Sequence, residues 1–185
     1  DIKANWKNII DNFVECYHCP IGHPAFADLI DMDSYRTKTY GIYSSHLSRC
    51  RERSKNKAYA HTGEDNSQVG CFWFLWPNLA FTVFPGPSNF SLLHAIPVGP
   101  ERTLEVFDFY FRGEDIGAAE KAMIEYIEKV LNPEDISLVE GVQRGLHSRG
   151  YSQGRLMVNP ERNENGEHAV HHFHGLVLDA LEQGD

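Results

Sequence analysis

Four runs of aromatic and β-branched residues follow one another between residues 69 and 113, and proline and glycine separate them at short intervals. The runs read VGCFWFLW, NLAFTVFPG, FSLLHAIPVG and RTLEVFDFYFRG. Runs of this composition, bounded by turn residues, are typical of β-strands. Their close spacing predicts an antiparallel meander, in which each strand pairs with the next. This meander restricts the possible folds more than any other feature of the sequence.

The residues before the meander predict a helix, one further strand and a loop. Residues 5 to 17 carry apolar side chains at helical spacing, and Pro20 ends this helix soon after His18. Residues 36 to 48 alternate as in a strand. Residues 49 to 68, RCRERSKNKAYAHTGEDNSQ, are polar and predict an exposed loop.

Three amphipathic helices are predicted after the meander. They span residues 114–131, 133–146 and 167–183. Asn132 is the predicted N-cap of the second helix, with Pro133 at its first position. A sheet followed by helices indicates an α+β fold, in which a curved antiparallel sheet carries helices on one side.

The composition narrows the classes of function. The 185 residues are most simply one domain. A net charge of −9 without any Lys/Arg run argues against a nucleic-acid partner. No stretch approaches the ~20 apolar residues of a membrane span, and the first residues, DIKANWKN, lack the form of a signal peptide. With four cysteines only, we expect a cytoplasmic protein without a disulfide framework.

The segment ECYHCPIGHP, residues 15 to 24, concentrates groups that bind metals. Cys16, His18, Cys19 and His23 form one candidate set, which suits zinc. A structural zinc site normally joins two pairs of ligands that lie a dozen or more residues apart, whereas these four fall within eight residues. This set is therefore disfavoured, and the two cysteines are expected to be buried as free, small apolar residues.

The second candidate set suits iron. Two histidines and one carboxylate, with open positions on the metal, are typical of non-haem Fe(II) oxygenases. His18, near a helix end, and His23, after the proline turn, are able to converge on one ion. The carboxylate has to come from elsewhere, and Asp135 in the first turn of the predicted helix is a candidate. An acid at that place is also explained by the helix dipole alone, so the residues by themselves leave the choice open.

A resemblance to a known family adds to this interpretation. NWKNIIDNFVECYHCPIGHP is similar to the start of the catalytic domain of Rieske-type ring-hydroxylating oxygenase α subunits. EDISLVEGVQRGL, WPNLAFTVFPG and GRLMVNPERNENGEHAVHHFHGLV also resemble this family, so the similarity covers almost the whole chain. It implies a helix-grip (Bet v 1/START-like) fold. It also implies that His18, His23 and Asp135 are the ligands of a mononuclear Fe(II), and that Glu15 links this iron to the Rieske cluster of a neighbouring subunit.

The resemblance further implies cofactors and partners that lie outside this sequence. A Rieske [2Fe–2S] centre needs a Cys-x-His motif followed later by Cys-x-x-His, and this chain does not contain that pair. We therefore expect residues 1–185 to be the mononuclear iron domain alone, without the N-terminal Rieske domain. The expected partners are O₂, a small-molecule substrate and a reductase that relays electrons from NAD(P)H, within a homotrimer.

The substrate class is the last expectation. Glutamate at position 15, where many aromatic dioxygenases of the family have aspartate, resembles the subgroup that oxidises betaines, choline and carnitine. The implied reaction is hydroxylation of an N-methyl group, followed by loss of formaldehyde. An aromatic-ring hydroxylase, a non-catalytic module for hydrophobic ligands and a zinc hydrolase are the alternatives.

Two further groups of residues are expected to be structural. The strand aromatics are expected in the core, and the helical histidines at the surface or behind the metal ligands. They are Trp73, Phe74, Trp76, Phe81 and Phe84, and His171, His172 and His174.

Overall fold

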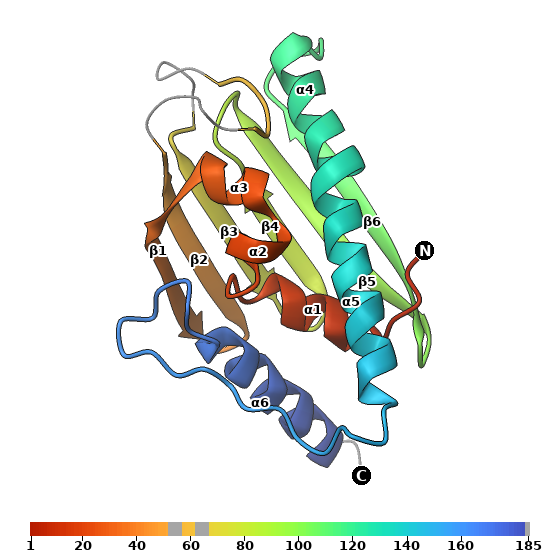
Figure 1. Cartoon of the computed structure of the whole chain (residues 1–185). Coiled ribbons are helices and arrows are strands. Elements are labelled where there is room, and N and C mark those ends of the chain that lie inside the picture. The colour runs from red at the N-terminus through yellow and green to blue at the C-terminus, as the bar shows by residue number, and fades with distance from the viewer. Residues whose placement is uncertain (52–56, 62–66, 184–185) are drawn as a thin grey trace.

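One antiparallel sheet of six strands forms a layer of the molecule, and its strands follow chain order from β1 to β6 (Figure 1). The computed structural model describes residues 1–51, 57–61 and 67–183. The strands are β1 (Ile30–Tyr40), β2 (Tyr43–Cys50), β3 (Val69–Leu75), β4 (Leu79–Val83), β5 (Asn89–Gly99) and β6 (Arg102–Phe111). The predicted meander is confirmed, because each of the strands β3 to β6 pairs with the next.

The prediction of one strand over residues 36 to 48 is wrong. A hairpin occupies this segment, with β1 ending and β2 beginning around the pair Tyr40 and Tyr43. Only two residues form the turn, and the paired residues Tyr40 and Tyr43 face the same side of the sheet, so the alternation shifts by one residue across it. The sequence analysis continued one pattern through this shift and so missed the reversal of the chain. The predicted loop over residues 49 to 68 lies partly outside the described residues, and residues 57–61 form neither helix nor strand.

The helices gather on one face of the sheet (Figure 1). They are α1 (Trp6–Phe13), α2 (Cys19–Gly22), α3 (Pro24–Leu29), α4 (Ala118–Tyr126), the π-helical turn η1 (Ile127–Leu131), α5 (Asn132–Leu146) and α6 (His168–Glu182). The last of the three predicted helices is confirmed as α6. None of the helices among the described residues is long and apolar enough to cross a bilayer.

The first predicted helix is shorter than expected. Asn5 caps α1 by accepting a hydrogen bond from the Lys7 amide, and the helix ends at Phe13 rather than at residue 17. The chain then turns, so Glu15 lies outside any helix. Pro20 does not stop a helix but lies in the first turn of α2, where its missing amide hydrogen costs no helical bond.

The predicted break before Pro133 is also wrong, because α4, η1 and α5 form one continuous helix. The Asn132 amide donates to the Ile127 carbonyl five residues back, so a wide π-helical turn precedes the proline. Pro133 has no amide hydrogen to donate, and it follows this turn without ending the helix. Asn132 has helical backbone angles and does not act as an N-cap.

Two hydrophobic cores lie between the sheet and the helices. In the first, Phe173 of α6 packs edge-on against Phe74 of β3, with ring centroids 5.3 Å apart, and Trp76 joins them. In the second, Phe84 and Phe72 pack against Phe26 of α3. The expectation that the strand aromatics are core residues therefore holds for Phe74, Trp76 and Phe84.

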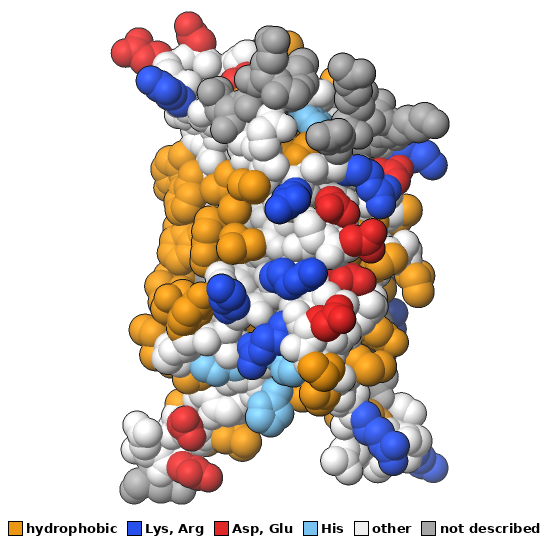
Figure 2. Space-filling model, turned by 90° about the vertical axis from the view of Figure 1, so that its left-hand side faces the viewer, with side chains coloured by type: hydrophobic (Ala, Val, Ile, Leu, Met, Phe, Trp, Pro, Cys, Tyr) orange, Lys and Arg blue, Asp and Glu red, His pale blue; other side chains and the backbone are white. Residues whose placement is uncertain are grey.

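Trp73 and Phe81 are different, because they belong to the opposite face of the sheet. They alternate with the buried residues of their strands and are only partly covered. This outer face is apolar along much of its length, as the margin of hydrophobic side chains in Figure 2 shows. Its exposed apolar residues include Leu47, Val69, Phe90, Leu104 and Tyr110.

Candidate metal centre

The short helix α2 brings two histidines together. His18 precedes its first residue, and His23 follows its last. The amides of Gly22 and His23 donate to the carbonyls of His18 and Cys19, both at 2.8 Å, so this turn is closed by its own backbone. The two imidazole rings meet edge-to-face with centroids 5.0 Å apart. A Cβ atom on Gly22 would lie 3.0 Å from Leu138 of α5, so glycine permits this turn to approach α5 closely.

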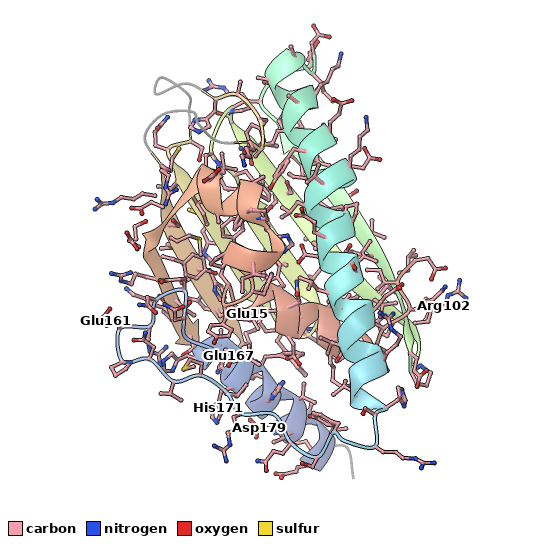
Figure 3. All side chains as sticks on the ribbon, in the orientation of Figure 1. Glu15, Arg102, Glu161, Glu167, His171 and Asp179 are labelled. Atoms are coloured by element: carbon pink, nitrogen blue, oxygen red, sulfur yellow. A yellow bond between two sulfur atoms is a disulfide. The ribbon has the colours of Figure 1, made fainter. Side chains whose placement is uncertain are left out.

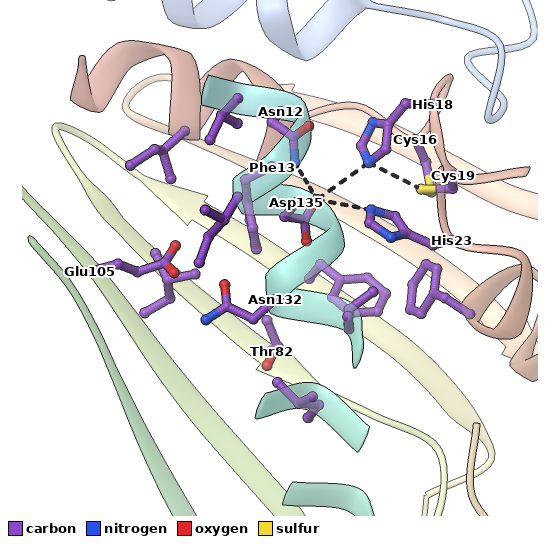
Figure 4. A pocket seen from close by; sticks show the side chains of 18 of the residues that line it. Asn12, Phe13, Cys16, His18, Cys19, His23, Thr82, Glu105, Asn132 and Asp135 are labelled. Carbon is purple, nitrogen blue, oxygen red and sulfur yellow. Dashed lines mark hydrogen bonds and ion pairs between the residues drawn. A yellow bond between two sulfur atoms is a disulfide. The ribbon is translucent and has the colours of Figure 1, made fainter. Parts of the chain in front are cut away.

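Asp135, in the first turn of α5, faces both histidines (Figure 4). Its Oδ1 atom lies 2.8 Å from Nε2 of His23 and 3.6 Å from Nε2 of His18. The same oxygen accepts a hydrogen bond of 2.5 Å from the side-chain amide of Asn12 in α1. Three segments far apart in the sequence therefore meet at one carboxylate.

Each of the two imidazoles is also oriented by a carboxylate of its own, at the ring nitrogen that faces away from Asp135. Nδ1 of His18 contacts the carboxylate of Glu15, and Nδ1 of His23 lies 2.9 Å from Oε2 of Glu134. The backbone amide of His18 also donates to Glu15. Both Nε2 atoms are thereby turned toward Asp135. Histidines that bind metals usually give their other ring nitrogen to a carboxylate or a carbonyl, as these two do.

The charges of this cluster shift the pKa values of its members. Burial alone lowers the pKa of His18, but Asp135 and Glu15 raise it to about 9 through hydrogen bonds and charge. The pKa of His23 is likewise raised by Asp135 and Glu134 against the effect of burial. Burial alone raises the pKa of Asp135, but hydrogen bonds from both histidines and Asn12 lower it to about 2. Without a metal, the protonated imidazoles are the cations that balance this carboxylate, and a metal ion bound by the same atoms would displace their protons.

The donor atoms fit a divalent metal. One atom each of His18, His23 and Asp135 lies within 4.8 Å of the others, the only such trio of His, Cys, Asp or Glu ligands within the described ranges. Two imidazoles and one carboxylate suit non-haem iron. His171 is exposed on α6 (Figure 3), and Nε2 of His174 lies 2.8 Å from the Asp11 carboxylate, so neither histidine joins this cluster.

The zinc alternative fails on its sulfur ligands. Cys16 and Cys19 are buried as expected, but they are not free, because a disulfide joins them. Sulfur in a disulfide is no thiolate and does not act as a zinc ligand. The sequence analysis expected reduced cysteines. The turn that follows α1 places their Cα atoms 4.9 Å apart, within the range that a disulfide spans.

A cavity opens beside the metal centre, between α1, α5 and the sheet. It encloses about 820 Å³ of empty space, including the part that is open to solvent. Its aromatic lining consists of Phe13, Phe26, Tyr35, Phe72, Phe84 and Phe107. The three residues of the metal cluster lie in its wall, so a molecule in the cavity reaches the metal position directly.

Gln143 holds α5 against α1 and was not singled out in the sequence. Its side-chain oxygen accepts hydrogen bonds from the Asn5 amide at 2.8 Å and from the Asn8 side chain at 2.9 Å. The residue is buried at two turns' distance from Asp135. These bonds fix the two helices that supply Asn12 and Asp135 to the centre.

We predict that Gln143→Ala lowers the free energy of unfolding by about 1–3 kcal/mol, because it leaves the buried Asn8 side chain and the part-buried Asn5 amide without their acceptor. Urea denaturation followed by tryptophan fluorescence measures this. The matched control is Arg144→Ala, whose side chain is exposed on the next residue and whose effect should stay within ~0.5 kcal/mol. Equal effects of the two substitutions would contradict the role given to Gln143.

Comparison with known proteins gives the family and the fold. Residues 1–183 match the family described as the ring hydroxylating alpha subunit (catalytic domain). The carnitine monooxygenase oxygenase subunit of Acinetobacter baumannii is 40% identical over 178 residues, which are 96% of this chain and 47% of that protein. Chloroplastic choline monooxygenase of Spinacia oleracea is 32% identical over 186 residues, 98% of this chain and 39% of that protein. The chain thus spans half or less of the length of these curated relatives.

Solved structures agree with these relatives. A crystal structure of the quaternary ammonium Rieske monooxygenase CntA superposes with a TM-score of 0.86 at 37% identity, over 95% of this chain and 47% of that one. Naphthalene 1,2-dioxygenase from a Rhodococcus species gives a TM-score of 0.67 at 15% identity, over 96% and 53%, and this shows the fold alone. The predicted α+β helix-grip fold is confirmed.

Proposed function

This chain belongs to the family of ring-hydroxylating α subunits, as their catalytic domain, and we propose that it is the iron domain of a monooxygenase for quaternary ammonium compounds. The observation that supports this most is the convergence of His18, His23 and Asp135 at one wall of an aromatic cavity. The substrate class follows from the similarity to proteins named carnitine and choline monooxygenases.

In this proposal His18, His23 and Asp135 hold a mononuclear Fe(II), which supplies the activation of dioxygen. The surrounding residues serve the ligands. Glu15 and Glu134 each hold a ring nitrogen and so keep the imidazoles in position. Asn12 holds the Asp135 carboxylate from the side of α1, and the apolar cavity limits the access of water to the substrate.

The proposed reaction is hydroxylation of an N-methyl carbon. One C–H bond, O₂, two electrons and two protons give the C–OH group and water. The hydroxymethylammonium product then breaks its C–N bond, as the hydroxyl proton leaves to solvent and the electron pair of the C–N bond stays on nitrogen. The products are formaldehyde and a tertiary amine.

The electrons come from outside this chain. We propose that residues 1–185 work with a Rieske [2Fe–2S] domain and with a reductase that oxidises NAD(P)H. Inter-subunit electron transfer is described for a quaternary ammonium Rieske monooxygenase whose structure is similar to this chain. We extend it to the present protein as a homotrimer, with Glu15 joining His18 to the Rieske cluster of the neighbouring subunit. The Glu15 and His18 side chains are partly exposed, which supports a contact between them and the neighbouring subunit.

The proposed ligand set is tested by metal content. The chain purified without oxygen should bind about one Fe(II), and His18→Ala, His23→Ala and Asp135→Ala should each lose most of it, because one of three ligands is gone. The control is His171→Ala, which removes an exposed histidine of α6 and should leave the iron content unchanged. Full iron in both His18→Ala and His23→Ala would place the metal elsewhere.

The proposed reaction is tested with hydrogen peroxide, which carries both the oxygen atom and the two electrons. The iron-loaded chain should oxidise a betaine slowly with peroxide, and it should not turn over with NADH and a reductase, because no Rieske cluster is present to pass electrons on. Mass spectrometry identifies the products. Formaldehyde reports attack at an N-methyl carbon, and another aldehyde reports attack at a methylene carbon. Oxidation of arenes but of no betaine would favour the ring-hydroxylating alternative, and a chain without iron would favour a binding module.

The role of Glu15 is tested in the enzyme that includes the Rieske domain. Glu15→Gln should keep the iron and a reducible Rieske cluster but lose most turnover, since outer carboxylates of this kind contribute roughly 10- to 100-fold to activity. Stopped-flow absorbance measures the transfer from reduced Rieske cluster to iron in a single turnover. A transfer rate equal to that of the unmodified enzyme would rule out the bridging role.

A further inference from the structure

The cavity beside the metal centre contains one acid that takes no part in the His–Asp cluster. Glu105 lies on β6, between Thr103 and Phe107 on the face of the sheet that the helices cover. Figure 4 shows its carboxylate across the cavity from His18 and His23. The strand therefore presents a charged group in a row of buried and aromatic side chains.

One oxygen of the Glu105 carboxylate is not satisfied by the protein. This atom, Oε2, is buried and has no hydrogen-bond partner among the described residues. Burial, with the charge of Asp135, raises the pKa of Glu105 to about 7, while a hydrogen bond from Asn132 and the amino group of residue 1 lower it. A buried carboxylate without a countercharge destabilises the empty fold, so its presence points to a ligand.

The charges around the cavity select the sign of that ligand. Apart from Tyr35, the ionisable groups in its wall are acids and histidines, and no Lys or Arg of the described chain lines it. Fe(II) bound by Asp135 and two neutral imidazoles has one positive charge, and the carboxylates of Glu15 and Glu134 behind the imidazoles offset it. The Glu105 carboxylate then adds a negative charge on the opposite wall, which favours a cationic ligand.

From these contacts we propose that Glu105 is the specificity-determining residue that binds the quaternary ammonium head of the substrate. The inference rests on the proposed function and adds the group that selects a cation over a neutral molecule. Phe107, two residues along β6, and Phe84 give the head apolar faces, where a cation is favoured over a neutral group. An arene in the same place would leave the Glu105 carboxylate without a countercharge.

The test compares a cation with its neutral isostere. Choline and 3,3-dimethyl-1-butanol have nearly the same shape, but the alcohol has carbon in place of the charged nitrogen. Isothermal titration calorimetry on the 185-residue chain should show that choline binds more tightly than the alcohol. Glu105→Gln should weaken choline binding on the order of 10-fold or more and leave the alcohol unchanged, because it removes the charge and keeps the shape.

Two controls separate binding from folding. Asp108→Asn removes the same charge from the exposed face of β6 and should leave both affinities unchanged. Glu105→Gln should melt at pH 8 at or above the temperature of the unmodified chain, because it relieves a buried charge. A lower melting temperature together with equal loss of both ligands would show a structural role and overturn the proposal.

The result also separates this inference from the proposed function. No preference for choline in the unmodified chain, or the same preference in Glu105→Gln, overturns the role of Glu105 even if the iron-loaded chain oxidises betaines. A preference for choline that is lost in Glu105→Gln supports the role of Glu105. If the same chain holds no iron and oxidises no betaine, the proposed function fails while the role of Glu105 stands.

Discussion

The Asp135 carboxylate is the group on which the arrangement of this domain depends. It is the first-turn acid of α5, and it accepts from Asn12 of α1 while facing the imidazoles at both ends of α2. A carboxylate away from bulk water is stable only when donors surround it, so these three segments have to meet. Gln143, two turns further along α5, fixes the same pair of helices from the other end. The centre is thus part of the packing, since the bonds that order the helices also order the ligands.

The π-helical turn η1 has a comparable effect on the long helix. It widens the helix immediately before Pro133 and lets the chain continue where a regular helix would lose a hydrogen bond. Asn132 and Asp135 then follow on one side at a spacing of three residues, and both line the cavity. Turns of this kind often occur at functional sites. In this domain the irregular turn lies next to the residue that faces both histidines.

The sequence predicted those parts of the structure that depend on local pattern. Runs such as VGCFWFLW specify strands by themselves, and β3 to β6 were identified correctly. His18 and His23 were paired because only a short turn separates them. The choice of Asp135 came from a family resemblance, since no local pattern links residue 135 to residue 18. The partners Asn12 and Glu134 were missed for the same reason, because each acts across a contact between distant segments. The Cys16–Cys19 disulfide was missed because these cysteines were expected to be reduced and buried as free residues.

Glu105 shows how such a residue can be recognised in a sequence. In RTLEVFDFYFRG, residues 103, 105, 107, 109 and 111 share one face of the strand, and four of them are threonine or phenylalanine. An acid in such a row opposes the pattern that folds the strand, and so it costs stability. Proteins keep a destabilising residue of this kind mainly where function requires it. The strand therefore has two features at once, an apolar face that builds the second core and one charge that the core does not need. The cavity lies where these two features meet, and there the Oε2 atom of Glu105 has no hydrogen-bond partner among the described residues.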